Sequence, residues 1–168
     1  MKEIMVYTER CNGCLTCVLA CAAAHAEDKT IVGAMAAGVP GRLFIQAVNG
    51  RPVPVLCRHC EEPACVAACM TGAMQKDPET GIVTNEGHEQ TCVGCWMCIM
   101  ACPYGAVVPA PGKEKMAIKC DRCPDRDVPA CVAACPNLAL AFIEPEDFAR
   151  ERQKSVATAL AVEAGVPA

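Results

Sequence analysis

The sequence predicts an α+β fold built of two similar halves and followed by a C-terminal helix, and three observations lead to this prediction. Sixteen cysteines fall into four groups of four that share one spacing pattern. The segments between these groups read as short strands joined by tight turns. Residues 144–168 contain no cysteine and have the pattern of a helix. A chain of 168 residues has the length of one domain.

Each cysteine group opens with C-x2-C and closes with C-x3-C, and the gap between these pairs is two, four, two and seven residues in the successive groups. No cysteine is left over for a disulfide or a catalytic thiol. The groups are Cys11, Cys14, Cys17 and Cys21; then Cys57, Cys60, Cys65 and Cys69; then Cys92, Cys95, Cys98 and Cys102; and finally Cys120, Cys123, Cys131 and Cys135.

This spacing is typical of iron–sulfur ligation. A C-x2-C-x2-C run lets one tight loop reach three irons of a [4Fe–4S] cubane, and the fourth cysteine ligates the other cluster of a pair. We expect a helix to start at the fourth cysteine, with Pro103 and Pro136 in its first position, where a missing N–H costs nothing. Structural zinc is one alternative, although its ligand pairs are usually separated by a dozen or more residues. Disulfides are the other, and they require an oxidising compartment.

Composition and the N-terminal sequence exclude several classes of protein. The first ten residues, MKEIMVYTER, contain no apolar signal-peptide region and no twin arginine, so we expect a cytoplasmic protein. No apolar run approaches the roughly 20 residues that span a bilayer. A net charge of −4 argues against a nucleic-acid partner.

The expected strands lie between the cysteine groups. Asn49-Gly50 is a favoured hairpin turn, and it separates two strand-like runs. The sequence DPETG separates the two strands of a second hairpin. The strands are expected at residues 42–48, 51–56, 73–76, 82–84, 116–119 and 138–143, helices at 18–26 and 66–69, and a surface loop at 108–113.

The C-terminal segment has the features of a separate helix. Pro145 and the acidic residues around it suit a helix start. Phe148, Val156 and Leu160 then fall roughly on one side of the helix. The sequence leaves two alternatives open: the helix packs back on its own domain, or it docks on a partner protein or a second copy of the chain.

In the order of its cysteine groups the chain resembles the four-cluster ferredoxin-like electron-transfer subunits of oxidoreductase complexes. These include the subunits of dimethyl sulfoxide reductase, formate dehydrogenase, hydrogenase, CO dehydrogenase and tungsten-dependent aldehyde oxidoreductase systems. The resemblance rests on all sixteen cysteines, on CRHCEEPACVAAC at 57–69, on KDPETGIV at 76–83 and on KCDRC at 119–123. It covers about residues 5–145 and leaves out the tail.

The resemblance implies four [4Fe–4S] clusters in two pseudo-symmetric units of bacterial ferredoxin type. In this family the first cysteine group pairs with the fourth and the second with the third, and each pair exchanges its last cysteines. Residues 1–143 would form this four-cluster domain and residues 144–168 a helical tail. The implied ligand sets are Cys11, Cys14, Cys17 and Cys135; Cys120, Cys123, Cys131 and Cys21; Cys57, Cys60, Cys65 and Cys102; and Cys92, Cys95, Cys98 and Cys69.

The function that the resemblance implies is electron transfer without catalysis. The protein would relay single electrons between a catalytic redox subunit, for which we favour a tungsten-pterin aldehyde oxidoreductase, and a flavoprotein linked to FAD and NAD. A CO dehydrogenase, a hydrogenase, a formate dehydrogenase or another molybdenum-pterin enzyme are the alternative partners.

An independent iron–sulfur enzyme is the alternative of another class, and the residues outside the cysteine groups give it little support. Such an enzyme needs an open metal site, a nucleophile or an acid–base pair. Of the three histidines, His59 is expected in an exposed loop and His25 and His88 on the surface, where they offer none of these. The cations beside the ligands either offset the charge of the clusters or are solvated; they are Arg58, Lys119 and Arg122.

Overall fold

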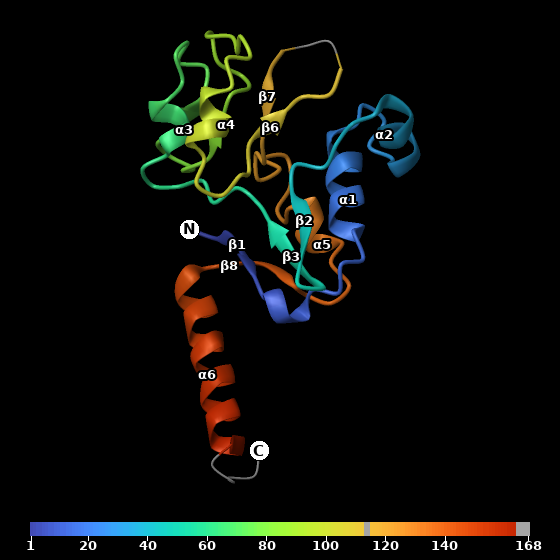
Figure 1. The fold of residues 1–168 in the computed structure, drawn as a ribbon, viewed down its shortest axis with the longest axis vertical. Helices are drawn as coiled ribbons and strands as arrows, with labels where there is room; N and C mark the ends of the chain where they lie inside the picture. The colour runs from blue at the N-terminus through green and yellow to red at the C-terminus, as the bar shows by residue number, and fades with distance from the viewer. Residues whose placement is uncertain (113–114, 164–168) are drawn as a thin grey trace.

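Short helices and two-stranded sheets alternate along the chain in the computed structural model, which describes residues 1–112 and 115–163 (Figure 1). This agrees with the predicted α+β class. The elements in order are β1 (Glu3–Val6), the 3-10 helix η1 (Thr8–Arg10), α1 (Thr16–His25), α2 (Ile31–Ala37), β2 (Phe44–Val48), β3 (Arg51–Val55), α3 (Ala64–Ala67), β4 (Gln75–Lys76), β5 (Val83–Thr84), α4 (Met97–Ala101), β6 (Val108–Pro109), β7 (Ala117–Ile118), α5 (Ala130–Ala133), β8 (Leu140–Ile143) and α6 (Pro145–Glu163).

The strands pair as antiparallel couples: β1 with β8, β2 with β3, β4 with β5, and β6 with β7. The β2–β3 hairpin is confirmed, and its turn has positive φ at both central residues, 51° at Asn49 and 75° at Gly50. Two positive φ values define the turn type whose twist matches the flanking strands. The β1–β8 pair joins the two ends of the cysteine-rich region, with Glu3 opposite Ile143.

The second predicted hairpin is also confirmed, as β4 and β5. Its turn is held by the Asp77 carboxylate, which accepts hydrogen bonds from the backbone N–H groups of Glu79 and Thr80. The expected loop at 108–113 is wrong at its start, because Val108 and Pro109 form β6 and pair with β7. Such a two-residue strand is too short to show an alternating pattern in the sequence. Residue 113 lies outside the described residues.

The prediction that helices start at the fourth cysteine of each group is wrong. Cys21 lies inside α1, and Cys102 is the residue immediately after α4. In each case the helix begins near the third cysteine, so about one helical turn separates the third thiol from the fourth. Pro103 and Pro136 therefore come after a helix, where a residue without an N–H cannot continue it. The sequence also did not predict α2, which Thr30 caps by accepting a hydrogen bond from the Gly33 N–H at 2.9 Å.

Buried side chains form two principal cores, and each contains thiols from two cysteine groups. The first lies where α1 packs against α5, and it includes Ile4, Leu43, Leu56 and Leu140. The second lies where α3 packs against α4, and it is formed by Met74, Val83, Cys98, Val107 and Ala117. In Figure 1 the α3–α4 core is at the top of the molecule and the α1–α5 core is below it. The fold therefore brings the first and fourth groups to one core and the second and third groups to the other.

The helix α6 leaves the cysteine-rich region and extends away from it at the end opposite α3 and α4 (Figure 1). Its first turns pack on the N-terminal segment: the Phe148 and Tyr7 rings lie 4.9 Å apart, and the Tyr7 hydroxyl donates to Glu151. Beyond these turns Val156 and Leu160 are 50% and 60% exposed. The helix thus packs on its own domain at its start and leaves an apolar face uncovered further on. Within the described part of the chain, α6 and the other helices lack the length and apolar character needed to cross a membrane.

Candidate iron–sulfur sites

Three cavities in the structure are each lined by four cysteines. One is lined by Cys11, Cys14, Cys17 and Cys135, a second by Cys57, Cys60, Cys65 and Cys102, and a third by Cys69, Cys92, Cys95 and Cys98. In each cavity the volume open to the centre of a water-sized sphere is about 20 Å³. In each cavity three thiols come from one cysteine group and the fourth is the last cysteine of another. Three nearly equal cavities with the same donor set indicate that each holds the same group.

The remaining cysteines lie together in the α1–α5 core. Cys21, Cys120 and Cys131 belong to the same buried cluster of side chains. Burial, and to a smaller extent the neighbouring Cys21, raises the pKa of the Cys120 thiol to about 12. Burial likewise raises the pKa of Cys131, as do its neighbours Cys120, Cys21 and Cys123. These four residues therefore surround one another and form a fourth thiol set.

Backbone N–H groups point at the cysteine sulfurs, as iron–sulfur ligation requires. The N–H two residues after the first cysteine donates to its Sγ in two groups, from His59 to Cys57 at 3.4 Å and from Arg122 to Cys120 at 3.3 Å. Both donor residues have positive φ, 45° and 66°. The last cysteines also accept N–H groups: Cys21 from Arg42, Cys69 from Met74, Cys102 from Ala106 and Cys135 from Ala139, at 3.2–3.4 Å.

The donor chemistry of the four sets fits [4Fe–4S] clusters. Each set offers four sulfur ligands, which is the ligation of a [4Fe–4S] cluster, and each set includes at least one sulfur that accepts a backbone N–H. Burial raises the pKa of Cys17 and of Cys65 to about 11, so without metal these thiols keep their protons at neutral pH. Metal must therefore displace a proton from each ligand as it binds. Buried thiols with a raised pKa are unreactive as nucleophiles, so these surroundings suit metal coordination rather than thiol chemistry.

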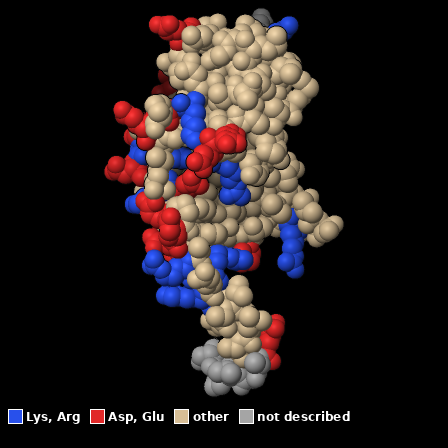
Figure 2. Space-filling view, turned by 90° about the vertical axis from the view of Figure 1, so that its left-hand side faces the viewer, with Lys and Arg blue, Asp and Glu red and all other residues tan. Residues whose placement is uncertain are grey.

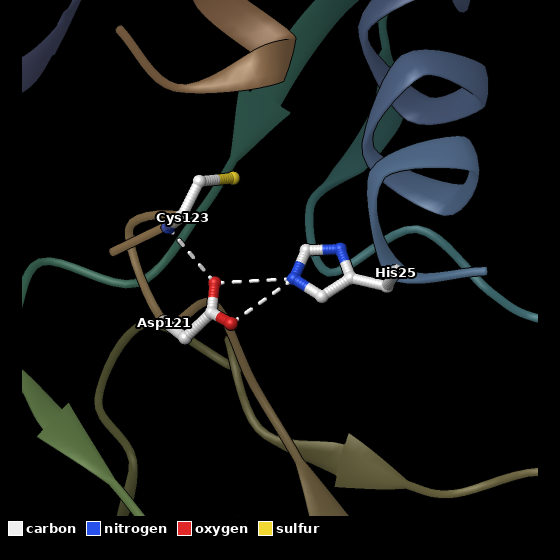
Figure 3. Close-up of side chains that lie close together, drawn as sticks. All are labelled: His25, Asp121 and Cys123. Carbon is white, nitrogen blue, oxygen red and sulfur yellow. Dashed lines mark hydrogen bonds and ion pairs between the residues drawn. The ribbon is translucent and has the colours of Figure 1, made fainter. Parts of the chain in front are cut away.

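A network of charged side chains lies beside the fourth thiol set (Figure 3). The Asp121 carboxylate is 3.1 Å from His25 Nε2, and it accepts the Cys123 backbone N–H at 3.0 Å. Arg42 donates to the same carboxylate at 3.0 Å and to Glu86 at 2.9 Å. The network fixes the turn between Cys120 and Cys123 against α1. His25, Asp121 and Cys123 are close enough together to hold a metal ion, but the Asp121 oxygens are already occupied by these donors.

The network shifts the pKa values of its members in opposite directions. Burial alone would lower the pKa of His25, but hydrogen bonds to Asp121 and to Cys21 raise it to about 10. Burial alone would raise the pKa of Asp121, but the hydrogen bonds from His25 and from the Cys123 N–H hold it well below its usual range. His25 is therefore a charged, half-buried partner of Asp121. The expectation that it is an exposed surface residue is wrong, because α1 carries it onto the Cys120–Cys123 turn.

His59 and two of the cations beside the cysteines are buried at the boundary between the two cores. The exposed fractions of His59, Lys119 and Arg122 are 6%, 3% and 8%. The Lys119 ammonium donates to the backbone carbonyls of Val83 and, at 2.7 Å, of Cys120. Burial, together with the charges of Lys119 and Arg122, lowers the pKa of His59 to about 3, so its ring is neutral.

The sequence therefore misplaced His59 and left the burial of Lys119 and Arg122 undecided. His59 was expected in an exposed loop, and solvation remained open for Lys119 and Arg122. His59 and Arg122 lie inside C-x2-C turns and Lys119 immediately precedes one, and these positions in the sequence give no sign of burial. Arg58 is exposed, with its guanidinium 5.9 Å from the centre of the Tyr104 ring.

Four thiol sets, amide donors at the sulfurs and small antiparallel sheets around them define an iron–sulfur protein of the ferredoxin type. Residues 48–144 match the family model of the 4Fe-4S dicluster domain, and the chain belongs to this family. The sixteen cysteines are enough for four [4Fe–4S] clusters.

Several curated proteins are similar over most of the sequence. An iron-sulfur protein of Rhodospirillum rubrum is 35% identical over 167 residues, which are 88% of this protein and 85% of that one. The electron transport protein HydN of Escherichia coli K12 is 31% identical, and the match covers 93% of this protein and 97% of HydN. The B subunit of the anaerobic dimethyl sulfoxide reductase of the same organism is 37% identical, over 89% of this protein and 76% of that subunit. The relatives are iron–sulfur electron-transport proteins.

Proposed function

We propose that this protein is an electron-transfer subunit that relays single electrons through four [4Fe–4S] clusters. The observation that carries the proposal is the presence of four separate sets of four thiols in one small chain. When bound, each cluster accepts and releases one electron. The residues of the chain hold the clusters, exclude water from them and direct N–H groups at their sulfurs, and these features set the reduction potentials.

The proposed ligand sets follow the exchange of last cysteines. Cys135 completes the first set, Cys21 the set of the fourth group, Cys102 the set of the second group and Cys69 the set of the third. Two ferredoxin-like units result, one around each core. Supporting this, the sequence PACVAAC occurs at residues 63–69 and again at 129–135, and in both places it forms a four-residue helix, α3 or α5.

Entry and exit of electrons are proposed at the two ends of the molecule. Cys14 and Cys95 are exposed, whereas Cys120, Cys123 and Cys131 are buried. The segments before α1 and before α4 lie at opposite ends of the cysteine-rich region in Figure 1, and α6 extends beyond the first of them. A partner cofactor can approach the outer clusters at these ends, and the buried sets then connect them.

We propose that the protein has no catalytic activity of its own. Ligation of each cluster by four thiolates leaves no iron position open for a substrate. The buried histidines are held by Asp121 or lie inside the cysteine turns, so they are not available as an acid–base pair on a substrate.

The proposed catalytic partner is a pterin-dependent oxidoreductase, with a tungsten-pterin aldehyde oxidoreductase as the specific candidate and an FAD- and NAD-linked flavoprotein as the second partner. The similarity to a subunit of a dimethyl sulfoxide reductase supports a catalytic subunit of this kind. A CO dehydrogenase, a hydrogenase and a formate dehydrogenase are the alternatives. Purification of the tagged protein from its own cells under anaerobic conditions, followed by mass spectrometry, distinguishes them by the metal and sequence of the co-purified subunit.

Anaerobic reconstitution tests the proposed function directly. The reconstituted protein is expected to bind about 16 iron atoms and a similar number of sulfides, and to give one low-spin electron paramagnetic resonance (EPR) signal for each reduced cluster. Dye-mediated electron transfer through the isolated protein is expected, without turnover of aldehydes, formate, CO or hydrogen. Binding of zinc in place of iron, or substrate turnover by the protein alone, would contradict the proposal.

The uncovered face of α6 is proposed to dock on a partner subunit or on a second copy of the chain. Charged side chains gather around the start of α6 on the face shown in Figure 2, whereas Val156 and Leu160 are apolar and exposed further along the helix. We expect Leu160→Asp to leave the iron content unchanged and to weaken assembly at least tenfold, measured by the fraction of partner that co-purifies. Thr158→Asp is the control, because Thr158 lies roughly opposite Leu160 on the helix. Loss of iron in Leu160→Asp would show instead that α6 belongs to the core.

A further inference from the structure

His59 lies in the C-x2-C turn of the second cysteine group and is 6% exposed. Its positive φ of 45° lets its backbone N–H donate to Cys57 Sγ. Its ring lies across the boundary toward β5, where Nδ1 accepts the backbone N–H of Val83 at 3.0 Å. Both the backbone and the ring of this residue are thus fixed.

The bond from Val83 determines which nitrogen of the His59 ring carries the proton. An imidazole nitrogen that accepts a hydrogen bond carries no hydrogen itself, so the proton of the neutral ring is on Nε2. Nε2 is completely buried and has no hydrogen-bond partner among the described residues. A buried N–H donor without an acceptor is unfavourable and rare in folded proteins. The structure therefore contains a fixed donor that calls for an acceptor.

The surroundings of the ring limit what this acceptor can be. The charges that act on His59 belong to Lys119 and Arg122, which have donors but no acceptor atoms, and to the Asp121 carboxylate. The Asp121 oxygens already accept His25, Arg42 and the Cys123 backbone N–H. His59 also lines the cavity enclosed by Cys57, Cys60, Cys65 and Cys102. The group that fits this cavity is rich in sulfur acceptors.

We propose that His59 Nε2–H donates a hydrogen bond to a sulfur of the [4Fe–4S] cluster in this cavity and raises the reduction potential of that cluster. The inference rests on the ligand sets of the proposed function. Reduction adds one electron to the cluster, so its sulfurs become stronger acceptors and the N–H bond stabilises the reduced form more than the oxidised form.

The position of His59 gives this hydrogen bond a role in the path between the two units. Val83 is held by His59 at its N–H and by Lys119 at its carbonyl, and Lys119 also donates to the carbonyl of Cys120. The ring thus lies where the second cysteine group meets the fourth. A donor at this point raises the reduction potential of the cluster of the second group, so that an electron resides preferentially on this cluster. It thereby sets the difference in reduction potential between the two units.

Two substitutions separate the donor from the structural role of the ring. In His59→Asn the amide oxygen can take the place of Nδ1 and accept the Val83 N–H, but no donor reaches the position of Nε2. In His59→Gln the amide nitrogen can take the place of Nε2. In EPR-monitored redox titrations of the full chain, we expect His59→Asn to lower the reduced-to-oxidised ratio of one cluster about tenfold at a given potential, a shift of about 59 mV. His59→Gln is expected to stay within about threefold of the natural protein.

A spectroscopic measurement tests the contact itself. With histidine labelled with ¹⁵N at Nε2, pulsed EPR of the reduced natural protein is expected to show a nitrogen coupling that is lost in both variants. Unchanged potentials of all four clusters in His59→Asn, or no coupling that depends on His59, would overturn the inference, as would a water molecule acting as the acceptor. If His59→Asn loses iron, the test is the nitrogen coupling of the reduced natural protein and its loss in His59→Gln. These two results show whether His59 Nε2 contacts the cluster. Failure of the ligand sets would appear separately, as an iron content of the natural protein well below about 16.

Discussion

Replacement of Cys102 by serine is expected to remove the cluster of the second cysteine group and to leave the cluster of its own group in place. Cys102 lines the cavity of Cys57, Cys60 and Cys65, although it lies only four residues after Cys98 in the sequence. A serine oxygen is a poor substitute for a thiolate on a [4Fe–4S] cluster. The iron content is therefore expected to fall from about 16 to about 12 per protein molecule, with loss of one EPR signal.

Double variants determine which cluster is lost. Cys60→Ser combined with Cys102→Ser is expected to remove one cluster and leave about 12 irons, because both residues are assigned to the same cluster. Cys95→Ser combined with Cys102→Ser is expected to remove two clusters and leave about 8 irons. The reciprocal variant, Cys69→Ser, should remove the cluster of Cys95. If each cysteine group bound its own cluster, the two double variants would give the opposite iron contents.

Asp121→Asn is expected to destabilise the protein by about 3 kcal/mol, the order of magnitude for removing one partner of a buried ion pair. Asp121 has two ionic partners, His25 and Arg42, and the exposed fractions of these three side chains are 11–18%. The substitution leaves His25 beside the fourth thiol set without its carboxylate, and it leaves Arg42 with Glu86 alone. It also weakens the hydrogen bond that fixes the Cys123 N–H, so the cluster in this set is expected to be lost first on heating.

The cost of Asp121→Asn is expected to depend on pH. The pKa of His25 is raised to about 10 in the folded protein, above its ordinary value of 6.5, so the pair stabilises the fold fully below pH 6.5 and loses this effect as the pH rises through 10. The pKa of Asp121 is depressed, so its contribution is present above 3.8 and is lost as the pH falls below that value. The difference between the natural protein and the variant should therefore be largest between about pH 4 and pH 6.5.

The decay of the cluster absorbance during thermal unfolding, recorded anaerobically across this pH range, measures the effect. Asp125→Asn is the matched control, because Asp125 is an exposed carboxylate in the same loop. A difference in stability that stays constant from about pH 5 to about pH 10 would show that His25 and Asp121 do not titrate as an ion pair.

The cysteine chemistry, the two hairpins and the C-terminal helix were determined by the sequence alone. Each is a local feature: the Asn49-Gly50 turn requires positive φ from its own two residues, and the fixed φ of Pro145 suits the first position of α6. The spacing of the cysteines also carries its meaning locally, because a C-x2-C turn directs its own N–H groups at its sulfurs. These features can therefore be predicted from one segment of the sequence at a time.

The burial of His59, Lys119 and His25 was decided only by the tertiary structure. Each lies in or beside a cysteine turn or a short helix that looks solvent-exposed in the sequence. Distant segments cover two of them directly: β5 covers His59, and the Cys120–Cys123 turn covers His25. The position of Cys102 in the cavity of the second group has the same origin, since it depends on how α3 packs against α4. Local spacing shows which residues can bind iron, but long-range packing determines which thiols meet and which polar groups are buried beside them.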